Sequence, residues 1–109
     1  MLRFTVNSPS ILSQIHNFLL DRPLAYYGRG FVRNDLGDKQ GAIDDYTLAI
    51  KFNPNDAYAY HGRGNVKSAL GDKQGAIADF QQAVKLYQQQ GGNEYWLRIA
   101  QDRIRELQQ

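Results

Sequence analysis

The octapeptide LGDKQGAI occupies residues 36–43 and returns letter for letter at residues 70–77, so that position 36 corresponds to position 70. Repetition at a period of roughly 20 to 50 residues is typical of proteins in which one supersecondary unit stacks on a copy of itself. The apolar face that one unit cannot bury alone is then buried by its neighbour. We therefore expect a repeat architecture, and such architectures bind other molecules more often than they catalyse reactions.

The same shift relates residues well outside the octapeptide. Mismatched pairs also keep their chemistry, because Tyr46 stands opposite Phe80 and Ile50 opposite Val84. The identical pairs are Tyr26/Tyr60, Gly28/Gly62, Arg29/Arg63, Gly30/Gly64, Val32/Val66, Asp45/Asp79, Ala49/Ala83 and Lys51/Lys85. The duplicated unit therefore fills most of the chain.

Composition limits the class of protein. The chain has 109 residues, of which 42% are hydrophobic and 22% charged, as expected for one globular domain. No apolar run approaches the roughly 18 residues that span a bilayer, so we expect a water-soluble protein that does not associate with membranes. The N-terminal residues lack the apolar stretch of an export signal, and the chain has no cysteine, which predicts a cytoplasmic location.

The charge pattern disfavours nucleic acid as a partner. The isoelectric point is near 9.0, yet the formal net charge is only +2. Lysines and arginines are scattered among acidic residues, whereas a protein that neutralises many phosphates concentrates its positive charge. We expect no nucleic-acid binding.

Hydrophobic spacing predicts about six helices and no strand. Ser8 and Pro9 form a helix-start signal, and Ile11, Leu12, Ile15, Phe18 and Leu19 then share one helical face. Prolines and glycines separate the later helices. The predicted ranges are from residue 9 to about 22, from 24 to about 36, 40–53, 58–70, from 74 to about 88, and from 93 or 94 to the end.

These residues resemble the tetratricopeptide repeat (TPR) family, whose repeating unit carries an aromatic, small residues at fixed offsets and a closing proline, and has the period seen here. In the first unit the pattern stands as Tyr26-x2-Arg29-Gly30, Ala42-x3-Tyr46-x2-Ala49 and Pro54, and in the second as Tyr60-x2-Arg63-Gly64 and Ala76-x3-Phe80-x2-Ala83. Trp96-x2-Ile99-Ala100 is similar to the opening of a third unit. The resemblance implies an all-α, short solenoid of antiparallel helix pairs with capping helices at both ends. Its parts would be an arm and capping helix (1–22), two repeats (23–56 and 57–90) and a C-terminal capping helix (91–109).

Three departures from the family pattern matter. Arg29 and Arg63 stand where the family usually has Leu; each either pairs with the aspartate at 45 or 79, or extends along apolar surface to water. Gln88 replaces the closing proline, so the second helix of that unit should run longer than its counterpart. The chain has only two complete units, so its terminal helices, or a second copy of the chain, must cover the open ends.

The resemblance also implies a concave groove, lined by the first helix of each unit, in which the family commonly holds peptides or helices of partner proteins. The residues that would line it are Tyr27, Phe31, Asn34, Tyr58, His61, Asn65 and Ser68, with Leu97 and Gln101 extending it. Aromatic groups interspersed with amides and a hydroxyl suit a peptide with apolar anchors. Alternatively, the N-terminal helix or a neighbouring chain covers the aromatics of this groove.

Catalysis has little support in the sequence. His16 and His61 are the only histidines, and neither has the spacing of a triad or of a metal site. We expect no enzyme activity, no cofactor and no metal. The leading hypothesis is a non-catalytic scaffold that binds a protein or peptide partner in the groove; the alternative is a structural protein that self-associates into a homo-oligomer, with the groove filled by its own helix.

Overall fold

The computed structural model describes residues 21–109, and these residues form five helices and no strand, as the all-α prediction required. The predicted helix that follows Ser8 and Pro9 lies outside the described residues, so five of the six expected helices are seen. Their bounds lie close to the predicted ones. The helices are α2 (Arg22–Asp35), α3 (Lys39–Phe52), α4 (Ala57–Ala69), α5 (Lys73–Gln90) and α6 (Glu94–Gln108).

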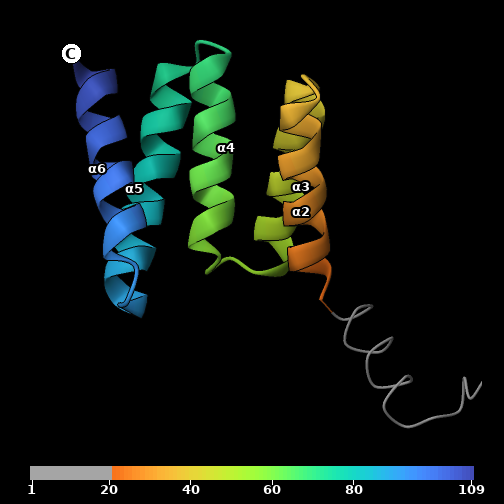
Figure 1. Cartoon of the computed structure of the whole chain (residues 1–109), viewed down its shortest axis with the longest axis horizontal. Helices are drawn as coiled ribbons and strands as arrows, with labels where there is room; N and C mark the ends of the chain where they lie inside the picture. Colours follow the sequence, from red (N-terminus) through yellow and green to blue (C-terminus); the bar gives the residue numbers. More distant parts are fainter. Residues whose placement is uncertain (1–20) are drawn as a thin grey trace, which may run out of the picture.

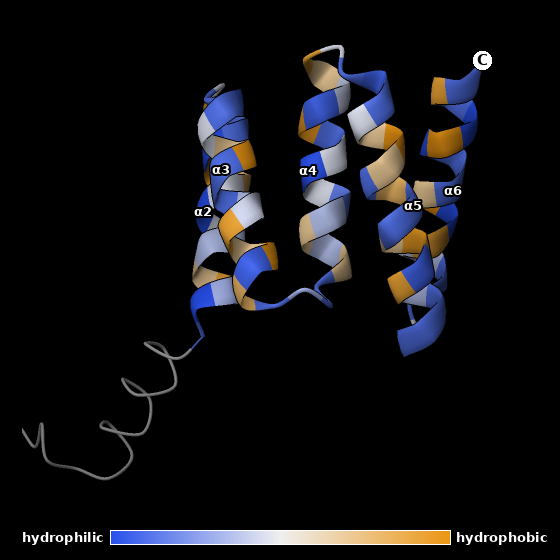
Figure 2. Ribbon diagram, turned by 180° about the vertical axis from the view of Figure 1, so that it is seen from behind, coloured by the Kyte–Doolittle hydropathy of each residue, from blue (hydrophilic) through white to orange (hydrophobic). Residues whose placement is uncertain are grey.

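The helices stand side by side in a row that runs from α2 and α3 through α4 to α5 and α6 (Figure 1). The α2–α3 and α4–α5 pairs pack most extensively, α3 packs on α4 to join the two pairs, and α5 packs on α6. This is the stack of antiparallel helix hairpins that the repeat predicted. Hydrophobic and hydrophilic residues alternate along each helix, because each presents one face to its neighbours (Figure 2).

The repeated octapeptide is a complete helix-turn-helix junction. Gly37 has a φ of +89°, a left-handed conformation in which a glycine ends the first helix at no steric cost. Asp38 then begins α3, and its carboxylate accepts a hydrogen bond of 2.9 Å from the Gly41 N–H. Gly71, with a φ of +86°, and Asp72, which accepts at 2.9 Å from Gly75, repeat this geometry before α5. The octapeptide recurs because the same junction is built twice.

The second helix of the second unit is longer than its counterpart, as predicted. α5 has 18 residues and α3 has 14. The lengths differ because of the residue at one corresponding position. Pro54 follows the end of α3, whereas Gln88, its counterpart in the second unit, lets α5 continue as far as the residue before Gly91. Gly91 and Gly92 both adopt a φ of +72°, and they turn the chain into α6.

The core consists of two clusters that share one design, in which small residues let helices approach and aromatic rings fill the remaining space. The first cluster is built around Tyr46, which is 2% exposed, together with Ala42 and Val66. The second is larger because α6 covers it. Its buried members are Ala57, Ala76, Phe80, Ala83, Leu86, Tyr87 and Ala100.

Both predicted arginine–aspartate pairs are formed, which confirms the first of the two interpretations. The Arg29 guanidinium donates two hydrogen bonds, of 2.9 and 2.8 Å, to the Asp45 carboxylate. Arg63 donates two of 2.8 Å to Asp79 in the same way. Each pair bridges the two helices of one unit in the bidentate geometry that only arginine provides.

A second cation reaches each buried aspartate. Arg33 Nη1 lies 3.1 Å from Asp45 Oδ2, and Lys67 Nζ lies 3.1 Å from Asp79 Oδ2. The two units differ in exposure, since the Arg29 side chain is 52% exposed and that of Arg63 only 17%. Water therefore screens the first pair more strongly than the second.

We predict that Asp79→Asn destabilises the protein more than Asp45→Asn. The first change leaves two poorly hydrated cations against a neutral amide, at a cost of about 3 kcal/mol, whereas Arg29 can turn to water and reduce the cost at position 45. Urea unfolding followed by circular dichroism measures both. Asp44→Asn, the same change at an exposed neighbour, is the control and should shift the unfolding free energy by less than about 0.5 kcal/mol. Equal losses at 45 and 79 would contradict this account.

Candidate functional site

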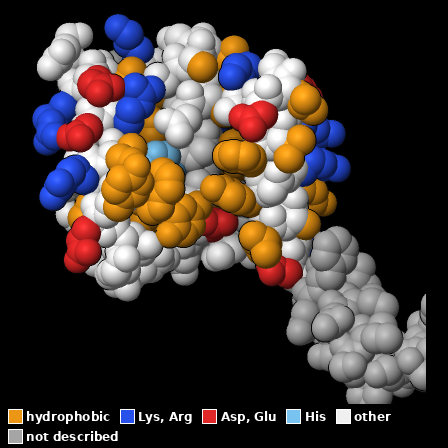
Figure 3. Space-filling model, viewed as in Figure 1, with side chains coloured by type: hydrophobic (Ala, Val, Ile, Leu, Met, Phe, Trp, Pro, Cys, Tyr) orange, Lys and Arg blue, Asp and Glu red, His pale blue; other side chains and the backbone are white. Residues whose placement is uncertain are grey.

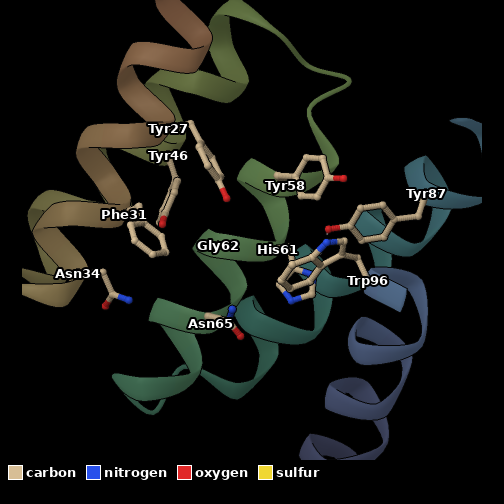
Figure 4. A pocket seen from close by; sticks show the side chains of 10 residues that line it. All are labelled: Tyr27, Phe31, Asn34, Tyr46, Tyr58, His61, Gly62, Asn65, Tyr87 and Trp96. Atoms are coloured by element: carbon tan, nitrogen blue, oxygen red, sulfur yellow. Dashed lines mark hydrogen bonds between the residues drawn. The ribbon is translucent and has the colours of Figure 1, made fainter. Parts of the chain in front are cut away.

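One face of the molecule carries a hollow bordered by α2, α4 and α6. In the space-filling view, hydrophobic side chains gather on both sides of this hollow (Figure 3). Its volume is about 140 Å³, close to the roughly 150 Å³ cavity that accepts a benzene-sized group. The residues that line it are Tyr27, Phe31, Asn34, Tyr46, Tyr58, His61, Gly62, Asn65, Tyr87 and Trp96 (Figure 4).

Six of the seven residues predicted to line a groove line this hollow, and they come from α2 and α4 as expected. The exception is Ser68, whose hydroxyl accepts a hydrogen bond of 3.0 Å from Arg103 Nη2 on α6. Of the two residues predicted to extend the groove, Leu97 packs instead against the larger core cluster, and Gln101 is not among the lining residues. Helices α2 and α4 thus place their inner-face residues as the pattern predicted. Helix α6 differs from the prediction, because neither Leu97 nor Gln101 extends the groove.

The lining residues differ greatly in how accessible they are. Phe31 is 53% exposed and Asn65 is also exposed, so both can touch a ligand directly. Tyr27 is only half-buried, but its ring tilts against that of Tyr46 at 5.7 Å, and it packs on the smaller core cluster. Tyr27 therefore stabilises the fold as well as lining the hollow.

Tyr58 joins the two sides of the site. Its ring meets Tyr87 at 5.6 Å and Trp96 at 6.3 Å, both edge-on. Its hydroxyl also donates a hydrogen bond of 2.8 Å to Asn93 Oδ1, next to the start of α6. Asn34, on the opposite wall, accepts a hydrogen bond of 2.7 Å from Lys39 Nζ. These bonds hold the rim of the hollow in place.

His61 forms the buried floor of the hollow, and it is only 6% exposed. Its ring lies edge-on to Phe80 at 5.4 Å and to Trp96 at 5.6 Å. Its Nδ1 is hydrogen-bonded to the Tyr87 hydroxyl at 3.2 Å. Burial, and then the positive charge of Arg103, lower the pKa of His61 to about 4, so the imidazole is neutral at physiological pH.

Three aromatic residues that sequence reasoning did not assign to the groove complete it. Tyr46 and Tyr87 belong to the core, yet they also reach the hollow, and burial raises the pKa of both phenols. The resemblance placed Trp96 as the aromatic of a third unit, comparable with Tyr60. Within the described residues no helix follows α6 to complete a third unit, and the indole lies against Tyr58 and His61 instead. The sequence signal that could have indicated this wall of the hollow is the group of aromatic residues Tyr87, Tyr95 and Trp96.

The chemistry of the hollow is neutral and largely apolar. None of its lining residues carries a charge at neutral pH. Within residues 21–109 no three His, Cys, Asp or Glu side chains come together as a metal site would require, and no helix there is long and apolar enough to cross a bilayer. The arrangement can hold one apolar side chain against aromatic rings and offer an amide at its edge.

The fold defines an α-helical repeat protein with a shallow hollow on one face. A family model described as TPR repeat matches residues 32–71, and one described as tetratricopeptide repeat matches residues 57–90. The chain therefore belongs to the tetratricopeptide repeat family, as the sequence motifs implied. Repeats of this family generally mediate protein–protein interaction, and the family is typically non-catalytic. Comparison with curated proteins gave no match.

The buried imidazole predicts a loss of stability in mild acid. Between the ordinary pKa of 6.5 and about 4, the unfolded chain binds a proton at His61 that the folded chain does not. The free energy of unfolding should therefore fall as the pH falls through this window, by about 3 kcal/mol in total. Urea titrations from pH 7.5 to about pH 4 measure this slope.

His61→Asn is the matched control, because an amide oxygen can accept from the Tyr87 hydroxyl but does not titrate in this window. The variant should be less stable at neutral pH, where ring packing is lost, and should show a shallower dependence on pH. The other titrating groups are the same in both proteins. If the two slopes agree, His61 is not the group responsible.

Proposed function

We propose that this protein is a non-catalytic scaffold that binds a short segment of a partner protein through the hollow between α2, α4 and α6. The observation that carries the proposal is the placement of Phe31 and Asn65 at the accessible edge of an aromatic pocket whose floor is packed and neutral. The general role of the family, protein–protein interaction, supports the same conclusion.

The pocket defines the ligand class. A volume of about 140 Å³ suits one large apolar side chain, and the aromatic rings around it favour an aliphatic or aromatic anchor. The uncharged lining gives no clamp for a terminal carboxylate, which would need lysine or arginine beside the amides. The Asn65 amide, with one acceptor and two donor positions, suits a peptide backbone next to the anchor. We therefore propose a segment with a buried Leu- or Phe-sized residue.

A catalytic role has no support in this site. His61 is the one titratable candidate with a pKa below neutrality in the hollow, and a pKa of about 4 makes it a weak general base. Its edge-on contacts with aromatic rings and its bond to the Tyr87 hydroxyl assign it to packing. The proposed chemistry of the hollow is therefore binding alone.

Phe31→Ala should weaken binding of a selected peptide by about tenfold or more, since truncation of an aromatic hot-spot residue commonly costs about 2 kcal/mol or more. Peptides are first selected from a random displayed library on the wild-type protein, and their affinities are then measured by calorimetry. Because Phe31 is more than half exposed, its removal should leave the helical circular dichroism signal unchanged. Tyr27 and His61 are unsuitable for this test because they also pack in the core.

The matched control is Leu36→Ala, which removes a large apolar side chain that is 79% exposed but lies outside the hollow. Its affinity should equal that of the wild type. Selected peptides should also share a large apolar residue whose replacement by alanine abolishes binding. Equal losses for Phe31→Ala and Leu36→Ala, or a selection that yields only charged motifs, would overturn the proposed mode.

A further inference from the structure

The two repeats present the same residues on the side that faces the N-terminus of the chain, but residues 21–109 cover only one of these faces. On α4, Ala59, Gly62 and Val66 face α3, and Val66 is 1% exposed. Their counterparts one repeat earlier, on α2, are Ala25, Gly28 and Val32, which we call the outer face. All three are exposed, Val32 by 52%.

The glycines at the centre of the two faces show the contrast most clearly. A Cβ atom added to Gly62 would lie 2.7 Å from Cζ of Tyr46, so the absence of a side chain there makes room for the ring from α3. Among residues 21–109, a Cβ atom added to Gly28 would meet nothing within 4 Å. Glycine in the interior of an exposed helix costs about 1 kcal/mol relative to alanine. The outer face therefore has the form of a helix-docking surface without its helix.

The template for the missing helix is α3, which brings Ala42 and Tyr46 to the cluster that contains Val66. The residues one repeat before Ala42, Tyr46 and Ala49 are Ser8, Leu12 and Ile15. A small residue, a large apolar residue and another apolar residue thus recur at the required spacing. Leu12 corresponds to Tyr46, the residue whose ring lies against Gly62.

The connection also has the right length. α3 ends at Phe52 and reaches α4 through residues 53–56, the last of which, Asp56, caps α4. Phe18 stands one repeat before Phe52, and Asp21 directly precedes α2. A segment that ends near residue 18 can therefore meet α2 from the same side as α3 meets α4.

Within residues 21–109, a second copy of the chain offers no helix equivalent to α3 with its ring free. The aromatic rings that pack against a glycine of a neighbouring helix are Tyr46 and Phe80. They are 2% and 0% exposed because residues of the same chain already cover them. The outward side of α6 carries charged residues, among them Arg98, Asp102 and Arg105. The buried rings could dock only if part of the copy unfolded, and the charged side of α6 is too polar to match the outer face.

We infer that residues 8–19 of this chain are the partner of the outer face, and that they dock on α2 as α3 docks on α4, with Leu12 over Gly28. The partner is an amphipathic segment supplied in cis, and the hollow is left open. This inference goes beyond the proposed function and does not depend on it.

Residues 1–109 contain no cysteine, which allows a direct test in this 109-residue chain. Leu12→Cys is combined either with Val32→Cys on the outer face or with Asn65→Cys at the hollow, and a short bifunctional thiol reagent is added. We expect intramolecular cross-linking of the 12/32 pair to be several-fold faster than that of the 12/65 pair. A faster 12/65 reaction, cross-links between molecules, or equally slow reactions of both pairs would each overturn the inference.

Gly28→Leu provides a second test, because it should change the melting temperature in opposite directions when the outer face is covered and when it is bare. If Leu12 lies on Gly28, a leucine there overpacks the contact and lowers the melting temperature by several degrees. If the face is bare, the stronger helix propensity of leucine raises the melting temperature. In a Leu12→Ala background the loss should shrink, because room is restored. A rise in the 109-residue chain would overturn the inference.

Discussion

The structure depends on one repeated contact, the insertion of an aromatic ring between helices that carry glycine at the point of contact. The Tyr46 ring lies 3.2 Å from the position a Cβ would take on Gly30 of its own unit, and 2.7 Å from that on Gly62 of the next unit. Phe80 makes the corresponding contact with Gly64 at 3.1 Å. A single side chain therefore closes a hairpin and joins it to its neighbour, which is why these helices need one another to be stable. The bidentate arginine–aspartate pairs then fix the angle within each hairpin.

The candidate site is a consequence of the same contact. Tyr46 separates α2 from α4, so the inner sides of these helices stand apart, and the hollow lies above the ring that holds them. Its floor is core, and its edge alone is accessible. A site of this kind is preorganised, because a ligand contacts rings whose rotamers packing has already fixed. The same arrangement is the reason to expect that a change at Phe31 preserves the fold while a change at Tyr27 does not.

The sequence was sufficient for the repeat, the helix bounds and the helix-turn-helix junctions, because Gly37, Asp38 and their copies act through local geometry. The family resemblance, read with helical periodicity, also identified six residues of the hollow. It could not reveal that His61 is buried or that Ser68 is occupied, because both depend on Trp96 and Arg103 from α6. Periodicity shows which residues share a face; it does not show how far a later helix extends over that face. The choice between paired and solvated arginines was likewise open until the helices were placed.

The two units share a sequence pattern but differ in their surroundings. This difference makes the second unit the more stable of the two within residues 21–109. In the second unit, α6 covers the core cluster, and Arg63 and Lys67 lie in poorly hydrated surroundings. In the first, within residues 21–109, the aromatic stack of Tyr26 on Phe52 and the Arg29–Asp45 pair stand near solvent. In a linear array each unit gains its stability from its neighbours, so on the contacts within residues 21–109 alone the first unit, with one covered side, would open first. The wall of the hollow that α2 supplies belongs to this weaker unit. Any segment that covers the outer face of α2 would therefore stabilise the wall of the proposed binding site from behind, without entering the hollow.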